Sequence, residues 1–221
     1  MTAGAFWAEI KELLVTHAPA RLNAKTATAT EYLPPVNLAL QEFSALALCL
    51  FDPAVTWTVA AGTRFDLDGN AFAKAIVWPV SVRYDGALLR NLADRVGPVT
   101  LDQMNLLQGG GGPMRWAWAP PNQLLTSATT TVVPATVAGF VRHSVLTTVD
   151  SVLELPGDMI RPASVFCALK LMEPRADGTM LNRYELLRKE AFDSINESAA
   201  RAVAAWPGVP VPLRLQGGQP E

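Results

Sequence analysis

The chain has 221 residues, of which 50% are hydrophobic and 17% are charged, and its formal net charge is −2. This length and composition allow one large domain, or a domain with an insert, around a packed core, and they exclude a largely disordered chain. The near-neutral charge argues against a protein that coats nucleic acid through a basic surface.

The N-terminal sequence MTAGAFWAEIKELL has no basic segment followed by an apolar one, as a secretory signal would. The longest apolar run, residues 44–51, is far shorter than a membrane span. Cys49 and Cys167 each lie in an apolar run, so we expect two buried free thiols in preference to a disulfide or a nucleophile. These features predict a soluble protein of a reducing compartment.

The first predicted element is a helix from about Ala5 to His17, which Pro19 closes. Apolar residues recur on one face of this helix at intervals of three and four, and the charged residues face away from them. The apolar face carries Phe6, Ile10, Leu13 and Leu14, and the opposite face carries Glu9, Lys11 and Glu12.

A second helix is expected to begin at Pro34-Pro35, because proline suits the first helical turn. It should end at about Phe51, before Asp52-Pro53. Its sequence is apolar nearly all round, so we expect it to be the buried helix of the helical part.

Glutamate and lysine mark a change of composition along the chain. No glutamate occurs between Glu42 and Glu154, and Lys74 is the one lysine in that stretch. Both residue types are favoured on exposed helix faces and depleted in strands. We therefore predict an α+β protein in which a bundle of about four helices carries an inserted β domain. The predicted boundaries are 1–52 for the first helical part, 53–155 for the β-rich insert, 156–206 for the second helical part and 207–221 for an extended tail.

The middle part is predicted to form short strands packed as a small β-sandwich or half-barrel. Tyr84-Asp85-Gly86-Ala87 is typical of a two-residue hairpin turn. Pro79 lies within a predicted strand and indicates either an edge strand or a bulge. The predicted strands cover residues 55–60, 75–84, 114–119, 135–141 and 149–155.

Two more helices are predicted after the strands. One runs from Asp158, as its N-cap, to about Met172, with Pro162 in its first turn, where a missing N–H costs little. The other runs from Leu181 to about Trp206 and is strongly amphipathic. Its apolar stripe consists of Tyr184, Leu187, Ala191, Ile195, Ala199, Ala202 and Trp206.

The stretch QGGGGPMRWAWAPPNQLL, residues 108–125, resembles a binding motif more than any other. A phosphate-binding loop would continue with lysine and open a helix, whereas here Pro113 and an alternating strand pattern follow. Trp116 and Trp118 share one face of that strand, which we interpret as core, with a partner-binding surface as the alternative. A mobile loop tip is expected at Gly109, Gly110, Gly111 and Gly112.

No catalytic, cofactor-binding or metal-binding residues are predicted. Asp66-Leu67-Asp68-Gly69-Asn70 begins like a calcium loop, but the glycine and glutamate that such a loop needs are replaced by Ala71 and Val77. His17 and His143, the two histidines, have no ligand spacing to other residues. The chain also lacks Gly-x-Ser-x-Gly, so it is not expected to be an enzyme.

Four segments, taken in order, resemble the head-to-tail adaptor proteins of tailed bacteriophages, also called connector or head-completion proteins. The first is the helix VNLALQEFSALALCLFDP. The second, VAAGTRFDLDGN, is similar to the strand and turn that open the family's β insert, and the third, AIVWPVSVRYDGALLRNL, is similar to the hairpin that follows. The fourth is VDSVLELPGDMIRPASVFCALKLMEPRADGTMLNRYELLRKEAFDSI, where a Leu-Pro dipeptide opens a helix and a long amphipathic helix follows. The resemblance spans most of residues 34–205.

The resemblance implies a structural virion protein without a cofactor. Such adaptors form a homo-oligomeric ring, commonly a dodecamer, below the portal of the filled capsid, and they extend the DNA channel and provide the docking surface for the tail. The implied partners are the portal protein, a tail nozzle or tail-completion protein, other copies of the chain, and DNA that passes through without sequence-specific binding; no membrane is involved. The implied location is the neck of the virion, after assembly in the host cytoplasm.

Partner contacts are expected at the glycine tip and in the tail, because prolines lower the entropy lost when an extended segment docks. Two alternative functions remain at this point: a small hydrolase, and a β-domain module that stacks a sugar or base on Trp116 and Trp118. The expected contact residues of the tail are Pro207, Val209, Pro210, Val211, Pro212, Leu213, Arg214 and Leu215.

Overall fold

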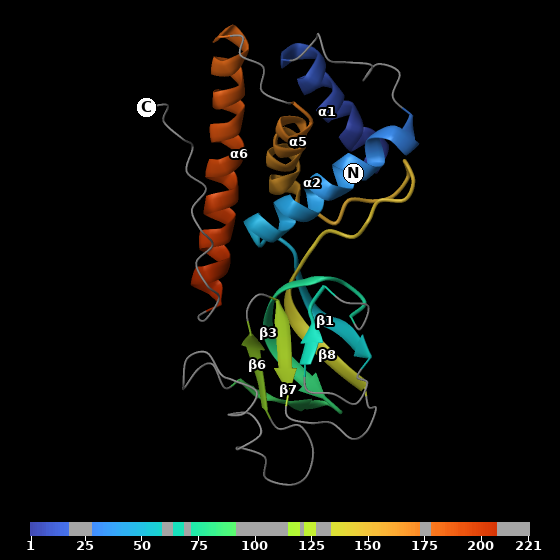
Figure 1. Ribbon diagram of the computed structural model, residues 1–221, viewed down its shortest axis with the longest axis vertical. Coiled ribbons are helices and arrows are strands. Elements are labelled where there is room, and N and C mark those ends of the chain that lie inside the picture. The colour runs from blue at the N-terminus through green and yellow to red at the C-terminus, as the bar shows by residue number, and fades with distance from the viewer. Residues whose placement is uncertain are drawn as a thin grey trace. The chain divides into compact units, whose positions relative to one another are not determined.

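The structure is a computed structural model, and it describes residues 1–17, 28–58, 64–68, 72–91, 115–119, 122–126, 134–172 and 178–206 (Figure 1). The described residues form a mixed α+β protein of two compact units. The helical unit contains Met1–Leu50 and His143–Ala205, and the β unit contains Phe51–Arg142 together with Trp206. The helical unit is therefore discontinuous in sequence, and the β unit is inserted between its two halves.

Four helices are described in the helical unit: α1 (Ala3–His17), α2 (Ala29–Ala47), α5 (Gly157–Leu171) and α6 (Gly178–Ala205). Helix α5 contacts each of the other three (Figure 1). Trp7 of α1 stacks on Tyr32 of α2 with ring centroids 4.4 Å apart, and Phe43 of α2 packs on Phe166 of α5 at 5.7 Å. The first contact lies within the half that precedes the β unit, and the second joins that half to the one that follows.

The buried helix of this unit is α5, and the expectation that α2 takes this place is wrong. Every residue of α5 from 162 to 169 is buried. In α2, by contrast, Pro34, Pro35 and Leu38 lie on an exposed strip, and Leu38 is 70% exposed. The small residues of α5, such as Ala163 and Ala168, let neighbouring helices approach it from several sides, which its sequence alone does not distinguish from a half-buried helix.

Helix α2 also begins earlier than predicted, at Ala29, and ends earlier, at Ala47. The Thr28 backbone N–H donates to the Glu31 carboxylate over 2.7 Å, and this bond lowers the pKa of Glu31. This capping interaction fixes the helix start six residues before Pro35. Both prolines therefore lie inside the helix, where each removes one N–H donor.

The later helices match their predicted ranges within a few residues. Pro156 occupies the N-cap position of α5, so Asp158 lies in the first turn and does not cap the helix. Pro162 consequently falls in the second turn, where its missing N–H leaves the carbonyl of residue 158 without its helical partner. In α6 the predicted stripe is confirmed at its centre, whereas Tyr184 is half-buried and Trp206 lies beyond the helix. The buried members of the stripe are Leu187, Ala191, Ile195, Ala199 and Ala202.

The described strands form two four-stranded sheets, with the orders β1-β8-β3-β4 and β2-β7-β6-β5. All pairs are antiparallel except β5 with β6. Trp57 of β1 packs edge-on against Phe65 of β2 at 4.7 Å, and Trp78 of β3 packs against Trp118 of β6 at 4.7 Å, so aromatic pairs join the two sheets. The strands are β1 (Phe51–Thr58), β2 (Arg64–Asp66), β3 (Ile76–Tyr84), β4 (Ala87–Leu88), β5 (Arg90–Asn91), β6 (Arg115–Ala119), β7 (Gln123–Thr126) and β8 (Pro134–Val141).

Four of the five predicted strands are present, but the strand predicted for residues 149–155 is wrong. That segment belongs to the helical unit and makes one isolated bridge, between Val152 and Thr2. The Ser151 hydroxyl accepts the backbone N–H of Thr148 over 3.0 Å and so closes a turn where the strand was expected. Strands β2, β4, β5 and β7 were not predicted, because each is only two to four residues long.

The hairpin prediction is confirmed. Tyr84 pairs with Ala87, and Asp85 and Gly86 between them have positive φ angles of 48° and 75°, as a type I′ turn requires. The bulge predicted at Pro79 is also confirmed, because the register of β3 against β8 shifts between Pro79 and Ser81. The edge alternative also holds at this position, because β4 pairs only with Arg83 and Tyr84, and within the described ranges Pro79 pairs with β8 alone.

We predict that Gly139→Ala destabilises the β unit. Gly139 lies opposite Pro79 at the bulge, where a Cβ would overlap the Trp78 carbonyl oxygen and approach the Pro79 Cα to 3.1 Å. Backbone atoms cannot yield as a flexible side chain would, so the free energy of unfolding should fall by roughly 2–3 kcal/mol in urea titrations. Gly157→Ala is the matched control, because a Cβ there meets no atom within 4 Å. Equal stability of the two variants would contradict the close backbone approach.

Candidate interaction site

The residues predicted for partner binding lie outside the described part of the chain. This holds for the glycine tip, Gly109, Gly110, Gly111 and Gly112, and for the tail residues Pro207, Val209, Pro210, Val211, Pro212, Leu213, Arg214 and Leu215.

One tryptophan of β6 lies in the core, and the other is partly exposed. Trp116 is 2% exposed, and Trp118 is half-buried against Trp78. The interpretation of Trp116 as core is thus confirmed, and its ring has no open face for a sugar or base. The indole N–H of Trp118 is buried and has no hydrogen-bond partner, which makes it a polar atom within an otherwise aromatic contact.

The carboxylates of the calcium-like stretch are engaged in hydrogen bonds between strands and turns. Asp66 accepts from the Gln123 amide over 3.0 Å, and Asp68 accepts from the Asn122 amide and lies 3.5 Å from the Arg142 guanidinium. Within the described ranges, no three His, Cys, Asp or Glu side chains gather as a metal site would require. The described acidic residues therefore serve structural contacts here.

Burial makes both cysteines poor nucleophiles. Desolvation raises the pKa of Cys49 to about 12 and raises the pKa of the fully buried Cys167 further. Both thiols are free, as predicted, although Cys49 is only half-buried. At neutral pH they remain protonated, and a protonated thiol does not attack an electrophile.

His143 is a structural residue. Its ring is buried, its Nδ1 lies 2.6 Å from the Ser144 carbonyl oxygen, and its Nε2 accepts the Glu154 backbone N–H over 3.1 Å. The ring therefore donates through Nδ1 and accepts through Nε2, which is the neutral form with both nitrogens occupied. Neither nitrogen is left to take a proton from a substrate.

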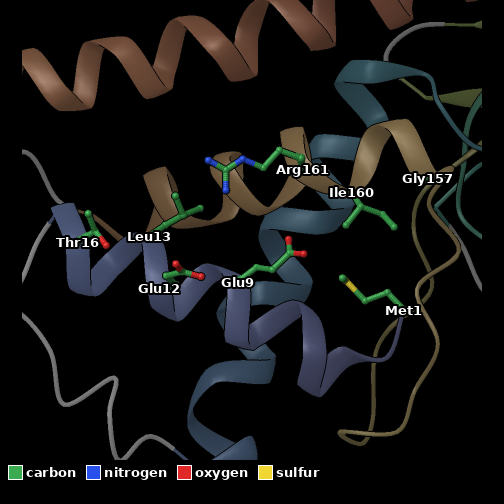
Figure 2. Close-up of a pocket in the computed structure, with 8 residues that line it drawn as sticks. All are labelled: Met1, Glu9, Glu12, Leu13, Thr16, Gly157, Ile160 and Arg161. Atoms are coloured by element: carbon green, nitrogen blue, oxygen red, sulfur yellow. The ribbon is translucent and has the colours of Figure 1, made fainter.

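A groove between α1 and α5 is the strongest candidate interaction site. It has a volume of about 630 Å³, and Figure 2 shows Glu9 and Glu12 on α1 facing Ile160 and Arg161 on α5. Arg161 is already paired, because its Nε lies 3.4 Å from a Glu190 carboxylate oxygen. The residues that line the groove are Met1, Glu9, Glu12, Leu13, Thr16, Gly157, Ile160 and Arg161.

The sequence did not reveal this groove. Glu9 and Glu12 were expected on the solvent face of the first helix, and this is how an acidic pair on an amphipathic helix ordinarily lies. The groove arises because α5, more than 140 residues later in the chain, lies opposite these two carboxylates. In the described part of the chain neither carboxylate makes a hydrogen bond or an ion pair, so the groove can accept a cationic group beside apolar surface.

Neither models of known protein families nor curated protein sequences match this chain. Among the helices in the described ranges, none has a stretch long and apolar enough to cross a bilayer.

We predict that both native thiols react slowly. At pH 8 a pKa of about 12 leaves about 10⁻⁴ of Cys49 as thiolate, against about a tenth for an unfolded thiol that ionises near pH 9. With an aromatic disulfide reagent followed by absorbance, two thiols should therefore react rapidly in urea, and none should react rapidly in the native protein. Because the unfolded thiols ionise near pH 9 and the native ones at higher pH, the free energy of unfolding should also fall as pH rises above 9. Rapid labelling of the native chain would contradict the stated burial.

The core position of Trp116 gives a second prediction. Trp116→Ala should lower the free energy of unfolding by roughly 3–5 kcal/mol, because it removes a fully buried ring. Trp118→Ala should cost less, since Trp118 is half-buried. Chemical denaturation followed by circular dichroism measures both. Parent-like stability of Trp116→Ala, accompanied by lost binding to a partner, would show instead that the ring is a contact surface.

Proposed function

We propose that the protein is a head-to-tail adaptor of a tailed bacteriophage, a structural protein that assembles as a ring below the portal. The observation that carries the proposal is the inserted arrangement. A helical unit made of residues 1–50 and 143–205 encloses, in sequence, a β unit of residues 51–142. This is the layout that the resemblance of the four sequence segments implies.

Exposed apolar residues of the helical unit support an assembly of several copies. Leu38 on α2, Val152 after β8 and Leu186 on α6 are each at least two-thirds exposed. Contacts between copies that cover these side chains would remove apolar surface from water. In a ring each copy uses one surface toward one neighbour and a different surface toward the other.

The charge of the chain agrees with a channel through which DNA slides. Strong phosphate contacts would hold the DNA in place, and their strength grows with the number of lysines and arginines that neutralise phosphates. The chain has 18 basic and 20 acidic residues, so its overall charge does not favour tight binding to DNA.

Within this proposal the β unit meets the tail component, and the glycine tip at Gly109–Gly112 adapts to its surface. The C-terminal tail, from Pro207 onward, attaches each copy to the portal or to the adjacent copy in the neck. Both assignments follow from composition, since glycine permits many backbone shapes and proline restricts an extended segment.

The assembly is tested by electron microscopy of the purified chain mixed with portal protein encoded beside its gene. We expect closed rings coaxial with the portal, because the heterologous contacts close by rotation. Leu186→Glu provides a variant that should fold normally, since the side chain is exposed, and that weakens the ring if α6 lies at the contact. Complexes with one adaptor per portal assembly, with no ring at any ratio, would contradict the proposal.

A further inference from the structure

We propose that the groove between α1 and α5 binds the C-terminal tail of a neighbouring copy, with Arg214 placed between Glu9 and Glu12. This inference rests on the proposed ring for its setting, and it names the donor and acceptor surfaces of the contact between copies. The occupant is the segment Val209–Leu215 of the adjacent chain.

The groove has the chemistry of a site for one cation flanked by apolar groups. Glu9 and Glu12 make no hydrogen bond or ion pair among the described residues, whereas Arg161, which lines the same groove, has a carboxylate partner in Glu190, 3.4 Å from its Nε. Leu13 and Ile160 add apolar surface from α1 and α5 beside the carboxylates (Figure 2). A carboxylate pair binds an arginine well, because its planar guanidinium can donate to both partners at once.

The tail has the matching composition. Residues 207–221 read PGVPVPLRLQGGQPE, in which Arg214 is the single basic residue and lies between Leu213 and Leu215. The Val-Pro-Val-Pro sequence before it restricts the backbone to extended conformations, so less entropy is lost on docking than for an unrestricted segment. A short extended segment with one cation and alternating apolar residues complements the groove in both charge and polarity.

The last turns of α6, after which the tail follows in sequence, contact the start of α5. Arg201 in the last turns of α6 lies 3.5 Å from Asp158 in the first turn of α5, and the adjacent Gly157 lines the groove. From Trp206 to Arg214 an extended chain spans about 25 Å at about 3.1 Å per residue. Because the tail and the groove are different surfaces, a contact between them is heterologous, and repeated contacts of this kind close into a ring.

The test is the binding of a fluorescently labelled peptide of residues 207–221 to the full-length chain, followed by fluorescence anisotropy. The peptide should bind the parent protein, and the double variant Glu9→Gln with Glu12→Gln should weaken binding by about tenfold or more, because both carboxylates are removed. A peptide with Arg214→Glu should fail to bind the parent and should recover binding to Glu9→Lys with Glu12→Lys, since this exchanges the charges.

The matched control is Asp193→Asn with Glu197→Gln, which removes two exposed carboxylates of α6 that do not line the groove. This control should bind the peptide like the parent. No binding to the parent, or equal binding to the Glu9/Glu12 variant and the control, overturns the inference. Rings that form without peptide binding leave the proposed function standing and remove the groove from it, whereas peptide binding without rings removes the adaptor proposal and keeps the groove.

Discussion

The helical unit depends on the hydrogen bonds that hold the chain on α2 where it returns from the β unit. At that point the backbone N–H of His143 donates to the Ser44 hydroxyl of α2 over 2.9 Å, and this hydroxyl in turn donates to the Gln41 carbonyl. Three residues later, the Asn37 side chain accepts the Leu146 N–H at 2.8 Å and donates to the Leu146 carbonyl at 2.9 Å. Buried polar groups satisfied in this way fix one arrangement of the two halves. With the return segment held on α2, α5 is led into the centre of the helical unit.

The two ends of the β unit are also held close together. Its first and last strands, β1 and β8, are paired, and Phe51 at the start of the insert lies opposite Phe140 near its end. An inserted domain is tolerated when its two ends lie close together, because the host unit then closes as though the insert were a short loop. The fold can therefore present two kinds of surface, helical and β, and this is what the proposed adaptor needs in order to meet two partners.

The sequence predicted those parts of the fold that depend on local patterns. The stripe on α6 and the turn at Asp85-Gly86 are set by spacing and by backbone preference, so both were found. The predicted start of α2 is wrong, because the capping pair Thr28 and Glu31 sets the start, whereas Pro34 and Pro35 are typical of a first turn but lie inside the helix. The groove could not be predicted, since Glu9 and Glu12 acquire their significance only from the position of α5. The glycine tip and the tail were singled out by composition, and their roles remain predictions.

The central claim is that many copies of this chain assemble on one portal. Native mass spectrometry of the chain co-expressed with a portal protein tests it most directly, because it counts copies. The account predicts a complex whose mass exceeds that of the portal alone by about twelve times the 23.7 kDa of one chain. A chain that remains monomeric at every concentration, or that joins the portal complex as a single copy, would contradict it.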